Sequence, residues 1–183
     1  MKKKIVYIAL SADILHEGHI NIITTASKYG NVIAGLLTDA AISSYKNIPT
    51  LNYKQREIVL RNIKLVKEVI PQKTLDYRPN LNLIKPNFVV HGDDWKTGPQ
   101  SETRKQVILT LKKWGGKLIE PKYTKNISSS AIKSKLINYH TPNNRISVLK
   151  RLLNTKKIIR VLESHSPLSG LIAENIKIRK RNS

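Results

Sequence analysis

Ile5-Val-Tyr-Ile-Ala-Leu-Ser-Ala-Asp-Ile-Leu-His16-Glu-Gly-His19-Ile-Asn21 is the stretch that decides the fold. Its apolar start, residues 5–10, predicts a buried strand, and Ser11-Ala12-Asp13 predicts a polar turn. A helical pattern then runs from His19 to about residue 29, with Ile20, Ile23 and Ala26 on one face. If His19 opens this helix, its free backbone N–H groups and positive dipole end face the same space as both imidazoles. Such a place suits an anion, and a nucleotide phosphate is the candidate that we favour.

The chain up to residue 138 continues to alternate strand and helix patterns. Further strands are expected at 32–37, 67–70, 88–91 and 117–120, and further helices at 53–66, from Pro79, at 101–114 and at 127–138. Asn52 is expected to cap the first of these helices, and Pro71 to stop the strand before it. This alternation predicts an α/β fold, a Rossmann-like parallel sheet with helices on both faces. Ligands of such sheets bind beyond the carboxyl ends of the strands, where the polar clusters of this sequence lie.

Composition narrows the class of protein. The 183 residues are 40% hydrophobic and lack cysteine, which predicts a folded protein with neither disulfides nor a thiolate zinc site. No apolar run is long enough for a membrane helix. The net charge of +21 would attract polyanions, so a basic, non-catalytic nucleic-acid-binding protein is an alternative of another class. Because the lysines are scattered and no aromatic-interleaved basic platform is present, we do not expect specific nucleic-acid binding.

The beginning of the chain mimics a secretory signal, because Lys2-Lys-Lys4 precedes an apolar run. Cleavage after Ala12 would remove the first predicted strand and leave the two-histidine turn unsupported. We therefore expect a cytoplasmic protein.

Phosphoryl transfer needs positive groups or hydrogen-bond donors around phosphate oxygens, and three places in the sequence can supply them. His16 and His19 can share one face of a helical turn, although a metal pair or a structural pair is the alternative. Ile127-Ser128-Ser129-Ser130 offers hydroxyls and backbone N–H groups at a helix start, or else an ordinary N-cap. Lys46 lies in a long polar loop and could fold over a triphosphate, or stay solvated.

Gly92-Asp93-Asp94-Trp95 follows a predicted strand, so both carboxylates should lie at the ligand edge of the sheet. One of them could help to hold Mg²⁺ or bind a sugar or a substrate amine. The alternative is a polar turn in which Asp93 caps the next segment.

These motifs together resemble a known family. His16-Glu-Gly-His19 resembles the His-x-Gly-His signature of the nucleotidyltransferase superfamily, and the wider pattern resembles glycerol-3-phosphate cytidylyltransferases. The resemblance rests on His16–His19, the Lys46 loop, Tyr53-Lys-Gln-Arg56, Gly92–Trp95 and Ile127–Ser130. It implies a dimer on a Rossmann-like fold that makes CDP-activated alcohols from CTP.

The resemblance also implies roles for individual residues. It makes His16, His19 and Lys46 catalytic, and Arg56, Asp94 and Trp95 acceptor-binding. It assigns the nucleotide to Ser11, Ala12, Asp13, Gly18, His91, Gly92, Asp93, Ile127, Ser128, Ser129 and Ser130, and Mg²⁺ mainly to the triphosphate, with Asp13 or Asp93 as a protein ligand. One departure is Tyr123-Thr-Lys-Asn-Ile-Ser, which replaces the arginine and glycine of the family's Arg-Thr-x-Gly-Ile-Ser.

A narrower resemblance concerns the acceptor. Residues 11–21, Gly35-Leu-Leu-Thr-Asp39 and His91-Gly-Asp-Asp-Trp-Lys-Thr-Gly98 are similar to cytidylyltransferases of phosphonate biosynthesis, which are often fused to phosphoenolpyruvate phosphomutase. The stretch from about Arg145 resembles the start of that mutase, truncated far below the roughly 250 residues of a (β/α)₈ barrel. We therefore expect a cytidylyltransferase domain over 1–140 and a helical or irregular tail over 141–183.

The function expected from these resemblances is transfer of a cytidylyl group from CTP to a small phosphonate or phosphate-ester acceptor. The favoured acceptor is 2-aminoethylphosphonate, giving a CMP-phosphonate and pyrophosphate for decoration of glycans or lipids. Glycerol-3-phosphate cytidylyltransferase, or another His-x-Gly-His nucleotidyltransferase, is the alternative in the same class.

Overall fold

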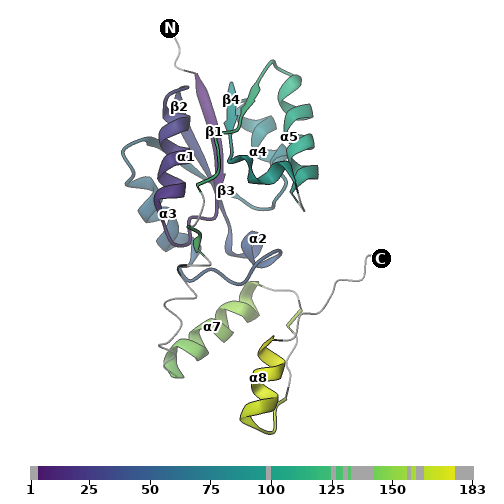
Figure 1. The fold of residues 1–183 in the computed structure, drawn as a ribbon. Coiled ribbons are helices and arrows are strands. Elements are labelled where there is room, and N and C mark those ends of the chain that lie inside the picture. The colour runs from purple at the N-terminus through teal and green to yellow at the C-terminus, as the bar shows by residue number, and fades with distance from the viewer. Residues whose placement is uncertain are drawn as a thin grey trace.

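The computed structural model describes residues 4–97, 100–124, 127–129, 132, 142–155, 158–159 and 163–175. Within this part of the chain, five parallel strands form one sheet in the order β3-β2-β1-β4-β5 (Figure 1). The strands are β1 (Ile5–Leu10), β2 (Asn31–Leu37), β3 (Val66–Gln72), β4 (Phe88–Val90) and β5 (Lys117–Ile119). The predicted α/β class and parallel sheet are confirmed.

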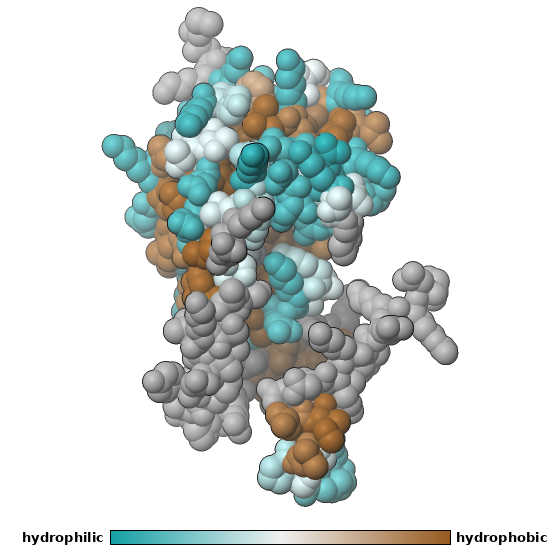
Figure 2. All heavy atoms as spheres, in the orientation of Figure 1, coloured by the Kyte–Doolittle hydropathy of each residue, from teal (hydrophilic) through white to brown (hydrophobic). Residues whose placement is uncertain are grey.

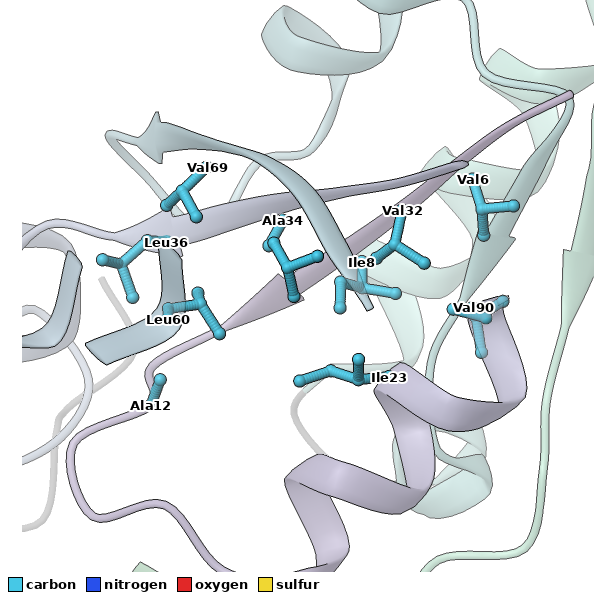
Figure 3. Packing of buried hydrophobic residues seen from close by; sticks show 12 residues of the cluster. Val6, Ile8, Ala12, Ile23, Val32, Ala34, Leu36, Leu60, Val69 and Val90 are labelled. Carbon is cyan, nitrogen blue, oxygen red and sulfur yellow. The ribbon is translucent and has the colours of Figure 1, made fainter. Parts of the chain in front are cut away.

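Helices cover both faces of the sheet because the residues of β1 alternate between them. Val6 and Ile8 pack with α1 (Glu17–Ser27) and α3 (Tyr53–Arg61), the cluster seen in Figure 3. Tyr7 and Ala9 point the other way, toward α4 (Arg78–Ile84) and α5 (Ser101–Lys112). Successive side chains of a strand point to opposite faces, so a fully apolar strand predicts a sheet buried on both sides.

Helix α1 begins two residues earlier than the sequence pattern predicted. It opens at Glu17, and His16 is its N-cap, so His19 is the third helical residue and does not open the helix. Ile23 and Ala26 are buried as expected, whereas Ile20 is 42% exposed. The prediction missed the start because histidine is not among the usual capping residues.

The region after β2 differs most from the prediction. A short helix, α2 (Asp39–Ser43), stands where a loop was expected, and Thr38 caps it. Asn52 caps α3 as predicted, but that helix ends at Arg61, before the predicted end at residue 66, and buries Arg56 and Leu60. The predicted helix was too long because Val66 belongs to the next strand.

Proline 71 does not stop β3, which continues through it to Gln72. The strand lies at the edge of the sheet, where a missing backbone N–H costs no ladder bond. The polar segment after β4 forms a short 3₁₀ helix, η1 (Asp93–Lys96). The predicted helix at 127–138 lies largely outside the described residues.

The C-terminal part contains α7 (Pro142–Thr155) and α8 (Pro167–Asn175). Helix α7 contacts α2, and Figure 1 shows it beneath that helix. Apolar side chains of α8 lie at the surface, where Figure 2 shows a brown patch. The boundary predicted at residue 140 stays a prediction. No helix within the described ranges is both long and apolar enough to cross a bilayer.

Candidate active site

A cavity of about 1060 Å³ opens at the carboxyl ends of β1, β2 and β4. This is the edge of a parallel sheet where ligands bind, as the sequence predicted. Three segments that are far apart in the sequence meet there: the β1–α1 turn, the segment from α2 to Lys46, and the turn after β4. The predicted site residues that line it are Ser11, Asp13, His16, Gly18, His19, Lys46, His91, Gly92, Asp94, Trp95, Ser128 and Ser129.

Two histidines form a reciprocal cap at the start of α1. The Gly18 N–H donates to Nδ1 of His16 at 3.2 Å, and the His16 N–H donates to Nδ1 of His19 at 3.4 Å. Each backbone bond therefore occupies one ring nitrogen, which resembles a capping box made by imidazoles. The ring centroids lie 4.0 Å apart, so the two rings are side by side at the cavity.

This cap decides which nitrogen of each ring carries a proton. An Nδ1 that accepts a hydrogen bond carries no hydrogen, so a neutral ring must carry its proton on Nε2. Burial lowers the pKa of His16, and burial, helped by His16 and Lys46, lowers the pKa of His19 to about 4. Both imidazoles are thus neutral at pH 7 and keep one N–H each for a ligand.

Glycine 18 is required by the same arrangement. A Cβ at this position would lie 3.0 Å from Cε1 and 3.1 Å from Nδ1 of the His16 ring. That is tighter than ordinary van der Waals contact, so a larger residue would displace the ring. The glycine between the histidines therefore has a packing reason of its own.

Lysine 46 enters the cavity from a segment that starts with α2. Its backbone N–H donates to the carbonyl of Ile42 at 2.9 Å, which continues the helical turn, and its side chain is exposed. Ser43, which the sequence analysis did not single out, also lines the cavity. The Ser43 hydroxyl is buried without a hydrogen-bond partner in the part of the chain that the structure describes. A buried hydroxyl of this kind is costly unless a ligand completes it.

The turn after β4 presents hydrogen-bond acceptors to the cavity, in contrast to the donors of the two histidines. Nδ1–H of His91 donates to the Gly92 carbonyl at 2.8 Å, and burial lowers the His91 pKa. A neutral His91 therefore has a lone pair on Nε2, which accepts hydrogen bonds. Its ring stacks on Trp95, with centroids 3.8 Å apart, and Asp94 lies 3.8 Å from Nδ1.

Glu120 and Arg104 hold Trp95 in place. Nε1–H of Trp95 donates to Glu120 at 2.8 Å, and Arg104 binds both oxygens of the same carboxylate. The Arg104 guanidinium is the main cause that lowers the pKa of Glu120. An ionised Glu120 thus fixes the indole under His91.

The serine segment contacts the β1–α1 turn although the two are 115 residues apart in the sequence. The Ser129 hydroxyl donates to the Ile14 carbonyl at 3.1 Å, and Asn21 donates to the Thr124 hydroxyl at 3.1 Å. These bonds bring the predicted phosphate cradle beside the histidines. Ser130 lies outside the described residues.

Four predicted ligand residues are not among those that line the cavity. Ala12 packs in the core, where its φ of +47° turns the chain after β1. Arg56 is fully buried and donates to the Leu51 and Ser11 carbonyls and to Asp39, so its contacts are with the protein's own groups. Asp93 accepts the Tyr123 N–H at 2.8 Å, as a turn residue does. Ile127 is the fourth.

Sequence reasoning missed one wall of the cavity. Gln72, Thr74, Leu75 and Tyr77 line it from the end of β3 and the segment after it. Gln72 is 1% exposed, and its side chain binds the Tyr7 hydroxyl and Asn80. The available signal was that Gln72 is polar and ends a strand. The predicted strand stopped at Pro71 and therefore did not include it.

The parallel sheet, the strand-to-helix turn and the paired imidazoles at the sheet's ligand edge agree with the nucleotidyltransferase resemblance of the sequence. A family model described as Cytidylyltransferase-like matches residues 11–135. The chain belongs to the cytidylyltransferase-like family. This confirms the superfamily and the cytidylyltransferase resemblance; the fusion to a phosphomutase stays a prediction.

Two curated relatives illustrate the similarity. The glycerol-3-phosphate cytidylyltransferase of Bacillus spizizenii is 34% identical over 98 residues, which are 52% of this chain and 74% of that enzyme. The ethanolamine-phosphate cytidylyltransferase of Dictyostelium discoideum is 30% identical over 137 residues. That match covers 72% of this chain but only 36% of the relative's length.

A solved structure supports the fold alone. The lipopolysaccharide core biosynthesis protein from Thermoplasma volcanium GSS1 superimposes with a TM-score of 0.57 at 21% identity. The match covers 68% of this chain and all of that one.

Proposed function

We propose that this protein transfers the cytidylyl group of CTP to a small acceptor that carries a phosphonate or phosphate group and an amine, with 2-aminoethylphosphonate as the favoured acceptor. The observation that carries the proposal is the division of the cavity by hydrogen-bond type. The β1–α1 turn and the segment after α2 offer hydrogen-bond donors, whereas the turn after β4 offers hydrogen-bond acceptors.

The donors suit the triphosphate. Nε2–H of His16 and of His19 can donate to oxygens of the reacting phosphate, and Lys46 adds a full positive charge. Neutral imidazoles can stabilise charge there without giving up a proton. Lys46 and its positive charge are also one reason why His19 stays neutral.

The reaction itself needs little from the protein besides alignment and charge neutralisation. An ionised oxygen of the acceptor attacks the α-phosphorus of CTP and forms the new P–O bond. The bond from that phosphorus to the oxygen bridging the β-phosphorus breaks, and this oxygen leaves with the electron pair as pyrophosphate. Because the acceptor oxygen is already ionised at neutral pH, no strong general base is required.

The hydrogen-bond acceptors in the turn after β4 suit an ammonium group. The Asp94 carboxylate can accept from a protonated amine, and so can Nε2 of a neutral His91. Glycerol 3-phosphate would offer hydroxyls to the same groups and would not neutralise Asp94. This contrast favours an amine-bearing acceptor over glycerol 3-phosphate.

We expect Mg²⁺ to be held mainly by the nucleotide. Among the described residues, no group of three or more His, Asp or Glu side chains gathers to hold a metal. Asp13 is a buried carboxylate at the cavity, with one oxygen accepting the Leu51 N–H at 3.0 Å. Carboxylate oxygen is a ligand that Mg²⁺ prefers, so Asp13 would be the protein's contribution. When bound, Mg²⁺ would neutralise charge on the triphosphate.

Pyrophosphate release tests the proposal. The full chain is incubated with Mg²⁺ and CTP and with 2-aminoethylphosphonate, ethanolamine phosphate or glycerol 3-phosphate in turn. We expect turnover with the amine-bearing acceptors, fastest with 2-aminoethylphosphonate, and more with CTP than with ATP. Preference for glycerol 3-phosphate would refute the acceptor assignment, and no turnover with any pair would refute the enzyme function. The homodimer and the cytoplasmic location stay predictions.

A further inference from the structure

Helix α7 lies beyond residues 11–135, which match the family, yet it binds the segment that carries Lys46. Arg151 makes polar contacts with this segment, and its side chain is 25% exposed. Its Nη1 donates to the Thr50 carbonyl at 2.8 Å, and its Nη2 lies 3.7 Å from Oδ2 of Asp39. One guanidinium thus bridges two points that are eleven residues apart in the sequence.

Those two points bracket the part of the active site contributed after β2. Asp39 is the first residue of α2, and Thr50 follows the loop that contains Lys46. Between them, Ser43 and Lys46 both line the cavity. The bond from the Lys46 N–H to the Ile42 carbonyl joins the lysine to α2, so a displacement of α2 would displace Lys46.

Asp39 connects this contact to the rest of the site. Its other oxygen, Oδ1, is 2.6 Å from Nη2 of Arg56, which is fully buried. Arg56 also donates to the carbonyl of Ser11 in the β1–α1 turn. The Asp39 carboxylate therefore lies between a core arginine that holds the histidine turn and an arginine from α7.

The Arg151 guanidinium has bonding capacity left over. Its Nε and Nη2 are buried without a hydrogen-bond partner in the described part of the chain. The 3.7 Å gap to Asp39 exceeds the roughly 2.8 Å of a charge-assisted hydrogen bond, so a movement of about 1 Å would close it. An arginine can bind two acceptors at once because its donors form a rigid fork, which suits it to holding both ends of one segment.

We propose that Arg151 is a positioning residue that holds the segment 39–50, and with it Lys46, at the triphosphate end of the cavity. Helix α7 is then part of the active-site architecture. The catalytic part of this inference rests on the proposed cytidylyl transfer, whereas its structural part does not.

Amide hydrogen exchange tests the structural part without any activity. In the full-length Arg151→Ala variant, the amides of Ser44 and Lys46 should exchange about tenfold faster than in the wild type, because a hydrogen bond to a charged group has been lost. The matched control is Lys150→Ala, which removes one positive charge from the adjacent, exposed position of the same helix. Exchange in 39–50 that is the same in both variants would overturn the proposal.

Kinetics test the catalytic part. If Arg151 acts through Lys46, Arg151→Ala should lower kcat about tenfold, Lys150→Ala should not, and adding Arg151→Ala to Lys46→Ala should cost nothing further. Additive losses in the double variant would overturn the coupling, and so would faster exchange with an unchanged kcat. If the wild type itself lacked turnover, the proposed function would fail while the exchange result stood. Should Arg151→Ala fail to fold, Arg151→Lys, which keeps the charge without the fork, replaces it in both measurements.

Discussion

Replacing His16 with asparagine would separate the two roles that the structure gives to one ring. Nδ1 of His16 accepts the Gly18 N–H and caps α1, and Nε2–H is the donor left for a phosphate oxygen. Asparagine is among the best N-caps, so His16→Asn should change the free energy of unfolding by less than about 0.5 kcal/mol. Its side chain cannot extend to the place of Nε2.

The expected loss of kcat is much larger than the expected loss of stability, so the two roles can be measured separately. Loss of one preorganised donor at the reacting phosphate should lower kcat by about 10²–10³, or about 3–4 kcal/mol. His16→Ala should lose the cap as well, at about 1 kcal/mol, and melt about 2–4 °C lower. Glu17→Gln, an exposed neighbour in the same turn, is the control and should leave kcat unchanged.

The assay is pyrophosphate release at saturating CTP, with thermal unfolding measured on the same samples. A His16→Asn variant that keeps more than a tenth of the wild-type kcat would refute the reasoning, because the ring would then contribute only a cap. A variant that melts far below the wild type would show that the cap depends on the ring itself.

Three other predictions follow from the contacts already described. Gly35→Ala should destabilise the fold by about 3 kcal/mol or prevent folding, because its Cβ would clash with the Tyr7 hydroxyl, which crosses the neighbouring strand; a melting temperature close to that of the wild type would contradict this packing. His19 has a pKa of about 4 in the folded state and about 6.5 in the unfolded state, so it adds no pH dependence to the stability well above pH 6.5. As the pH falls, the unfolded chain takes up its proton first, and the folded state loses stability. Urea unfolding of the ligand-free protein should therefore show about 3 kcal/mol less stability at pH 4 than at pH 7 from this group, a difference that His19→Gln should remove. Asp94→Asn should raise the KM for 2-aminoethylphosphonate about 10–100-fold with little change for glycerol 3-phosphate; a raised KM for CTP instead would assign Asp94 to the nucleotide.

Much of the sheet could be predicted from the sequence because its strands are apolar on both faces. Residues 5–10 and 32–37 had no polar side to expose, so only a sheet covered on both sides could bury them. The errors came where local pattern and tertiary position disagree. Pro71 would end an interior strand, yet β3 lies at the edge and continues through it.

The residue types of the site were predictable, but several of their positions were not. Arg56 was expected at the acceptor, and the structure buries it among Asp39, Leu51 and Ser11 instead. An arginine on a helix gives no sign of whether its head will meet a ligand or the protein's own carbonyls. Gln72 and Tyr77 went unnoticed because their importance arises from the cavity they share with a distant strand.

The sequence alone determined the class of fold and predicted a cluster of polar side chains at one edge of the sheet, since periodicity and the His16–His19 spacing are local properties of the chain. The tertiary structure alone decided the protonation of the two rings, because this depends on burial and on backbone donors of the folded cap. It also decided that an arginine near residue 150 meets the start and the end of the Lys46 segment. Contacts between residues a hundred positions apart are set by packing, which no local pattern records.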